Sequence, residues 1–151
     1  MLFVIAAFAG WLLHVIRPPA PTAATAAVTC SAPATPSNRA RVSVAETRAL
    51  VESPEVLVVD ARARLEFVTG HIAGAVNVPA GDDESIRTAL PTLRGAATVI
   101  TYCEVVEACS CADELATRLV EEGIRDVRVL AGGLQAWIAA GNPAEAGGCS
   151  L

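Results

Sequence analysis

The sequence contains no lysine, one methionine and only 4% aromatic residues, and 18% of its residues are charged. Together with a hydrophobic fraction of 53%, so little charge excludes an intrinsically disordered chain. The 11 basic residues, all arginine, are outnumbered by 16 acidic ones, and the net charge is −5. Nucleic-acid binders normally present a basic face, so we expect no nucleic-acid partner. Five cysteines in 151 residues are too few for a fold held by disulfides, and their odd number leaves at least one thiol unpaired within the chain.

Residues 1–16 are expected to form an apolar membrane anchor or a signal segment. Residues 2–16 carry no charge, and as a helix they would be about 22 Å long, which is short for a bilayer core of about 30 Å. A cleaved signal peptide and the end of a longer membrane protein are the alternatives, although the positive region that begins a signal peptide is missing. Because Arg17, Arg39 and Arg41 follow the apolar run, we expect a single-pass anchor with the rest of the chain in the cytoplasm. A cleaved signal would instead export it.

The remaining chain divides into a linker, one domain and a tail. Residues 17–40 are rich in proline and alanine and contain no acid, which predicts a linker, and the Gly-containing residues 146–151 are expected to be a flexible tail. Residues 41–145 predict one α/β domain, in which strands alternate with helices and therefore form a parallel sheet. Apolar, β-branched runs predict strands at 56–59, 75–78, 97–102 and 127–130, and helices are predicted at 43–51, 64–68, 82–90, 110–122 and 134–140.

Polar residues that could carry chemistry follow two of these strands. Asp60 and Arg62 come directly after the run 56–59, and Cys103 follows the strand 97–102, with Ser110 beginning a helix seven residues later. In open α/β sheets, sites lie beyond the carboxyl ends of the strands. A loop that leads into a helix N-terminus gathers backbone N–H groups and favours an anion. Cys103 is therefore either a nucleophile with a stabilised thiolate or a buried structural cysteine.

Three stretches resemble the rhodanese-like family. VVDARARLEFVTGHIAGAVNVP, from Val58 to Pro79, resembles its first signature, Tyr102-Cys103 resembles its active-site motif, and VRVLAGGLQAWIAAGNP at 127–143 resembles its closing signature. This resemblance implies a three-layer α/β sandwich with a five-stranded parallel sheet flanked by helices, the fifth strand lying near residues 41–44. It also implies a single-domain sulfurtransferase, in which a cysteine takes a sulfane sulfur from a donor such as thiosulfate or a persulfide and passes it to cyanide or a thiol.

Carried onto this sequence, the resemblance makes Cys103 the persulfide carrier. The backbone amides of the following loop would cradle the transferred sulfur, while Asp60 and Arg62 would order the loops, and no cofactor or metal is expected. His71 and Trp137 are interpreted as structural. Cys109 is a possible resolving thiol, which would attack the persulfide, release sulfide and leave a disulfide with Cys103. The predicted loop consists of Glu104, Val105, Val106, Glu107, Ala108 and Cys109.

The loop departs from the pattern of active family members because it has no glycine, arginine or lysine. Glu104 and Glu107 are anionic where an anionic donor would bind, and like charges disfavour both a thiolate and thiosulfate. Two other functions therefore stay open: a catalytically silent module for an unknown protein partner, and a thiol–disulfide redox domain using Cys103 and Cys109. A metal site from these two cysteines and Cys111 would lack a fourth ligand.

Overall fold

The computed structural model of the chain describes residues 40–104 and 110–148. In this part of the chain, strands and helices alternate in sequence, as the apolar patterning predicted. They are β1 (Arg41–Val42), α1 (Val44–Leu50), β2 (Val56–Asp60), α2 (Arg64–Thr69), β3 (His71–Ile72), β4 (Val76–Asn77), α3 (Asp83–Gly95), β5 (Thr98–Tyr102), α4 (Cys111–Glu121), β6 (Val127–Leu130), α5 (Gly133–Ala139) and β7 (Ala144–Glu145).

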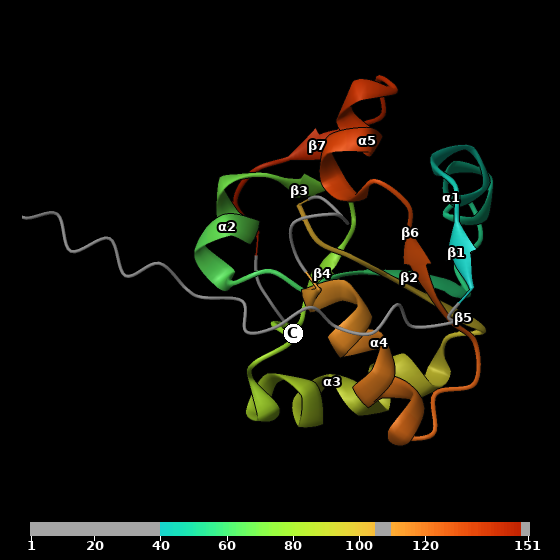
Figure 1. Cartoon of the computed structure of the whole chain (residues 1–151), viewed down its shortest axis with the longest axis vertical. Helices are drawn as coiled ribbons and strands as arrows, with labels where there is room; N and C mark the ends of the chain where they lie inside the picture. Colours follow the sequence, from blue (N-terminus) through green and yellow to red (C-terminus); the bar gives the residue numbers. More distant parts are fainter. Residues whose placement is uncertain (1–39, 105–109, 149–151) are drawn as a thin grey trace, which may run out of the picture.

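The central sheet has five parallel strands in the order β1-β6-β5-β2-β4 (Figure 1). β5 and β2 lie in its middle and pair over their whole lengths, from Val56 beside Thr98 to Asp60 beside Tyr102. Their residues are mostly apolar and largely β-branched, which suits strands that are covered on both faces. The predicted α/β fold with a five-stranded parallel sheet flanked by helices is thus confirmed.

Helices cover both faces of the sheet and make three layers. Alternate residues of a strand point to opposite faces, so Val59 packs with the core beneath α3 and α4, whereas Val58 packs with the core beneath α1, α2 and α5. Leu93, Leu115 and their neighbours fill the first core. The second core is filled by the side chains of Phe67, Ile72, Tyr102, Leu130, Leu134 and Trp137.

Local sequence signals explain where two of the helices begin. Ser43 caps α1, since its hydroxyl accepts a hydrogen bond from the Glu46 backbone N–H and the Glu46 carboxylate accepts one from the Ser43 backbone N–H. The Asp82 carboxylate accepts hydrogen bonds from the N–H groups of Glu84 and Ser85 at the start of α3. These caps fix the directions in which the two helices leave the sheet.

Two sequence-based boundaries were wrong, and one small sheet was not predicted. Helix α3 does not stop at Leu90 but continues through Pro91 to Gly95, because its last turn places Leu93 in the core with 0% exposure. That burial outweighs the missing proline N–H. The strand predicted at 75–78 is shorter, with β4 comprising two residues. A small antiparallel sheet of β3 and β7, which pairs His71 with Glu145, was not predicted.

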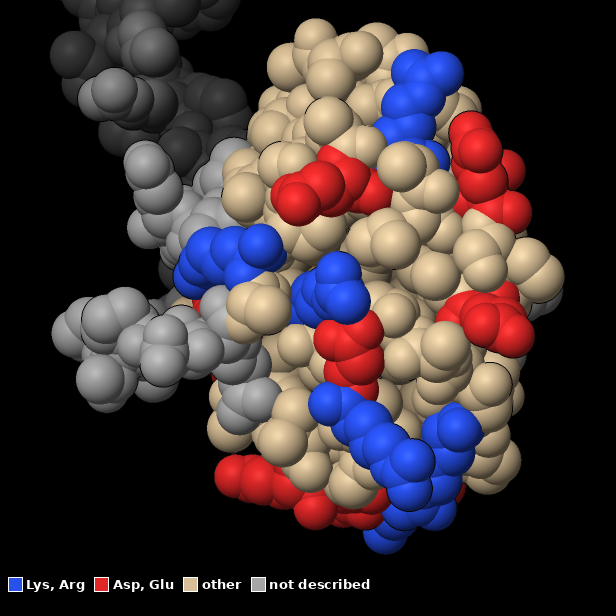
Figure 2. Space-filling view, turned by 90° about the vertical axis from the view of Figure 1, so that its right-hand side faces the viewer, with Lys and Arg blue, Asp and Glu red and all other residues tan. Residues whose placement is uncertain are grey.

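Predictions for the chain ends lie outside the described residues. The apolar segment 1–16, most of the linker 17–40 and the last residues of the tail belong to this part of the sequence. Within residues 40–104 and 110–148, no helix is long and apolar enough to cross a membrane. On the face drawn in Figure 2, arginine side chains lie beside acidic ones across the surface.

Candidate active site

The carboxyl edge of the sheet brings together three polar residues from three adjacent strands. Asp60 ends β2 and stands in register with Asn77 of β4 on one side and with Tyr102 of β5 on the other. All three are buried, with exposures of 0%, 2% and 0%. Cys103 follows Tyr102 directly, so it lies at the same edge. The structure therefore places the predicted residues of the two polar clusters at the same edge of the sheet.

Cys103 is 1% exposed and packs on the α3/α4 side of the sheet with Ala61, Ala80 and Ala112 in the same core. Its backbone is fixed from the opposite side, because the Leu134 N–H at the start of α5 donates to the Cys103 carbonyl oxygen at 2.9 Å. Cys103, which directly precedes the loop, is thus held at a defined position next to the sheet.

Gly133 allows this contact between α5 and the loop. Its φ of +58° lies in the left-handed region, which glycine adopts without strain. A Cβ atom there would also clash with the carbonyl oxygens of Cys103 and Glu104. Only a residue without a side chain lets the start of α5 approach the loop so closely. Gly133 belongs to the glycine pair of the closing signature, which is the signal that points to it in the sequence.

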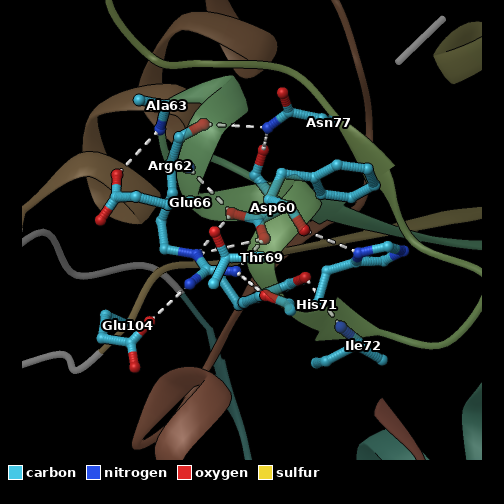
Figure 3. Close-up of polar contacts among 12 residues, drawn as sticks. Asp60, Arg62, Ala63, Glu66, Thr69, His71, Ile72, Asn77 and Glu104 are labelled. Atoms are coloured by element: carbon cyan, nitrogen blue, oxygen red, sulfur yellow. Dashed lines mark hydrogen bonds and ion pairs between the residues drawn. The ribbon is translucent and has the colours of Figure 1, made fainter. Parts of the chain in front are cut away.

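Arg62 links Asp60 to the loop (Figure 3). Its Nη2 lies 2.6 Å from Asp60 Oδ2, its Nε donates to Asp60 Oδ1 at 3.0 Å, and the side chains are 5% and 0% exposed. Nη2 also donates to the Gly70 carbonyl oxygen at 2.6 Å, and Nη1 donates to Glu104 Oε2. The guanidinium carbon lies 5.9 Å from the centroid of the Tyr102 ring. Arg62 therefore joins β2, the start of the loop and the end of α2.

The surroundings of Arg62 and Tyr102 shift the pKa of both side chains upward. Burial alone would lower the pKa of Arg62, but the hydrogen bonds and negative charge of Asp60 outweigh it and hold that pKa above its usual value. Burial and the Asp60 carboxylate raise the pKa of Tyr102, whose hydroxyl oxygen accepts a hydrogen bond from the Ile72 N–H at 3.1 Å. Arg62 is thus a permanent cation, and Tyr102 is a neutral phenol.

The Glu104 side chain accepts hydrogen bonds from two residues that belong to different parts of the fold. Arg62 donates to one of its carboxylate oxygens and Gln135 Nε2 donates to the other, and its side chain is 39% exposed. The Gln135 backbone N–H also donates to the Glu104 carbonyl oxygen at 3.2 Å. Gln135 was not predicted, because it lies 31 residues away in the sequence and a glutamine in a short helix carries no recognisable signal.

Asn77 and Thr101 fix the flanks of the site. The Asn77 amide donates to the carbonyl oxygens of Asp60 and Arg62 at 3.1 and 2.9 Å, which holds the turn after β2. The Thr101 hydroxyl donates to the carbonyl oxygen of Ala112 at 3.0 Å and so ties the first turn of α4 to β5. These contacts hold the turn after β2 and the first turn of α4 at the carboxyl edge of the sheet.

The other predicted residues are distributed as follows. His71 is 2% exposed, stacks on Phe67 and has its Nδ1 2.9 Å from the Phe67 carbonyl oxygen, as suits a structural residue. Trp137 is buried and donates to the Pro143 carbonyl oxygen at 2.9 Å. Among residues 40–104 and 110–148, no three side chains are grouped so that they could hold a metal ion. Val105, Val106, Glu107, Ala108 and Cys109 lie outside the described residues.

The fold and site define an α/β domain with a cysteine at the carboxyl end of the central strand. Residues 43–140 match the model of the rhodanese-like domain, and the chain belongs to that family. A solved rhodanese-like domain from Anabaena is 28% identical to it, with a TM-score of 0.60 over 70% of this chain and 78% of that one. A thiosulfate sulfurtransferase from Pseudomonas aeruginosa is 26% identical, with a TM-score of 0.58 over 74% of this chain and 21% of that one.

Two curated proteins are also similar in sequence. An HTH-type transcriptional regulator of Mycobacterium tuberculosis is 32% identical over 96 residues, and the dual specificity phosphatase Cdc25 of Arabidopsis thaliana is 28% identical over 97. These matches cover 64% and 60% of this chain. They cover 40% and 66% of the two relatives, so the chain spans only part of the length of each.

Proposed function

We propose that this domain is a sulfurtransferase that carries sulfane sulfur as a persulfide on Cys103. The observation that supports this most is the position of Cys103, which follows the central strand β5 and has its carbonyl oxygen bound by the first turn of α5. The family includes thiosulfate sulfurtransferases, one of which is similar to this chain in sequence and fold.

In the first half of the reaction, the Cys103 thiolate attacks the outer sulfur of the donor. A bond forms between Cys103 Sγ and that sulfur, and the donor's sulfur–sulfur bond breaks. The leaving group takes the electron pair, as sulfite from thiosulfate or as a thiolate from a persulfide. In the second half, cyanide or a thiol attacks the outer sulfur and Cys103 leaves as a thiolate. The backbone amides of residues 104–109 are proposed to stabilise the bound sulfur.

Mapping of the transferred sulfur tests this proposal. The full chain is incubated with thiosulfate, or with a thiol persulfide, and each cysteine-containing peptide is weighed by mass spectrometry. We expect one added sulfur on Cys103, its removal by cyanide, and no such addition in Cys103→Ser. The variant Cys149→Ser, which changes a thiol in the tail, should be labelled like the native chain. If no donor labels Cys103, the domain is not a sulfurtransferase and the interaction-module hypothesis replaces it.

The same mass-spectrometric measurement tests whether Cys109 resolves the Cys103 persulfide. If it resolves the persulfide, labelled protein should release sulfide and gain a disulfide between Cys103 and Cys109, whereas Cys109→Ser should retain the added sulfur. A disulfide formed under mild oxidation without any sulfur transfer would favour the redox function.

Cellular placement is a separate proposal. We propose that residues 1–16 tether the domain to a membrane with the domain on the cytoplasmic side, as the arginines after the apolar run suggest. A topology reporter fused after Leu151 should be active only in its cytoplasmic form. Activity only on the exported side would favour a cleaved signal.

A further inference from the structure

The charged cluster formed by Asp60, Arg62 and Glu104 at the carboxyl edge of the sheet has a net negative charge. Arg62 provides one positive charge, while Asp60 and Glu104 provide two negative ones, and all three are joined by direct contacts. An anionic sulfur donor that approaches this edge of the sheet therefore meets a cation that is already paired with two carboxylates.

Arg62 has little hydrogen-bonding capacity left for a donor. A guanidinium has five N–H groups. Nε donates to Asp60, the two N–H groups of Nη2 serve Asp60 and the Gly70 carbonyl oxygen, and Nη1 donates to Glu104. Because the side chain is 5% exposed, turning it toward a bound anion would break contacts that are shielded from water. Arg62 thus does not replace the basic residue that this loop lacks.

The Glu104 carboxylate is fixed in place and remains partly open to solvent. Consecutive Cα atoms are about 3.8 Å apart, so the backbone of Glu104 directly adjoins that of Cys103. Arg62 and Gln135 hold its two oxygens, and Gln135 also binds its backbone. A charge held at this position acts on an approaching anion over roughly one Debye length, which is about 10 Å at 0.1 M ionic strength.

We propose that Glu104 determines the donor specificity of this site, favouring sulfane donors that carry less negative charge than thiosulfate. The inference rests on the proposed sulfur transfer and names its donor class. The relevant comparison is between two donors with the same reacting sulfur: thiosulfate, a dianion that leaves as sulfite, and methanethiosulfonate, a monoanion that leaves as methanesulfinate. In each reaction the Cys103 thiolate forms a bond to the terminal sulfur, the donor's sulfur–sulfur bond breaks, and the leaving group takes the electron pair.

The test compares kcat/KM for both donors, with cyanide as acceptor, in the native full chain and in Glu104→Gln. The substitution removes the charge while keeping the shape and one hydrogen-bonding oxygen. At about 0.01 M salt, where the Debye length is about 30 Å, we expect kcat/KM for thiosulfate to rise about two- to fivefold. The gain for the monoanion should be roughly the square root of that factor, because its charge is half as large. Both gains should shrink at about 0.15 M salt.

Glu122→Gln is the matched control. Glu122 lies at the end of α4, at the opposite edge of the sheet, and it forms an ion pair with Arg94 at 3.8 Å. This variant changes the net charge by the same amount and should leave the ratio of the two donors unchanged. Sulfur transfer with the same donor ratio in native chain and Glu104→Gln would overturn the inference while leaving the proposed function standing. Absence of sulfur on Cys103 with either donor would overturn both.

Discussion

The Arg62 guanidinium lies directly against the Asp60 carboxylate, with Nη2 2.6 Å from Oδ2 and both side chains almost fully buried. One residue separates them in the sequence. Asp60 is the last residue of β2, and Arg62 lies in the turn that follows this strand. Desolvated charges of this kind are tolerated because each is the other's partner. The pair connects the sheet to the loop, since the same guanidinium also binds Glu104.

Asp60→Asn should therefore be strongly destabilising. It leaves Arg62 charged and buried without its main counterion, and loss of one member of a buried pair costs about 3–5 kcal/mol. The free energy of unfolding in urea, followed by circular dichroism, measures the loss. Glu84→Gln breaks an exposed ion pair with Arg87 and should change stability far less, because solvent already screens both groups. Equal effects of the two substitutions would contradict the role assigned to the buried pair.

Gly133→Ala should disturb the site as well as the fold. Besides the strain of the left-handed backbone, its new Cβ would clash with the carbonyl oxygens of Cys103 and Glu104, so the loop start must move. Gly141→Ala is the control, since Gly141 has φ of +73° but open space around its Cβ position. Strain alone costs about 1–2 kcal/mol, which both variants should show in urea unfolding. Only Gly133→Ala should also slow the labelling of Cys103 by a sulfur donor.

The central fold could be predicted from the sequence because its signals are local. The strands β2 and β5 are runs rich in apolar, β-branched residues, and the polar residues at their carboxyl ends mark the edge where the candidate site lies. The contacts of Glu104 with Gln135 could not be predicted, because they depend on how α5 docks on the loop. The continuation of α3 through Pro91 was missed for a similar reason: the core contact of Leu93 decides it, and a proline rule considers only the neighbouring turn.

Acid should weaken the fold partly through Asp126. Hydrogen bonds from Arg128 and from the Thr98 hydroxyl hold the pKa of Asp126 below its ordinary value of 3.8. Between the two values the unfolded chain binds a proton that the folded chain does not, so the stabilisation is complete above the ordinary pKa and is lost as the pH falls through the folded one. In urea titrations between about pH 7 and 2, the native chain should lose its advantage over Asp126→Asn as Asp126 becomes protonated. A difference that stays constant over this range would show that Asp126 has the same pKa in both states.

Tyr102→Phe should separate the stability of the site from its chemistry. The variant keeps the buried ring beneath Arg62 but removes the oxygen that accepts the Ile72 N–H at 3.1 Å. An unsatisfied buried N–H costs about 1–3 kcal/mol, and urea unfolding should show a loss of this size, accompanied by faster hydrogen exchange at the Ile72 amide. Thr69→Val is the control, because it deletes a hydroxyl that binds the Leu65 carbonyl oxygen on an exposed helix turn. Since Cys103 is held by α5 and not by the phenol, folded Tyr102→Phe should still load sulfur at the native rate, and a slower rate would mean that the hydroxyl also orders the loop.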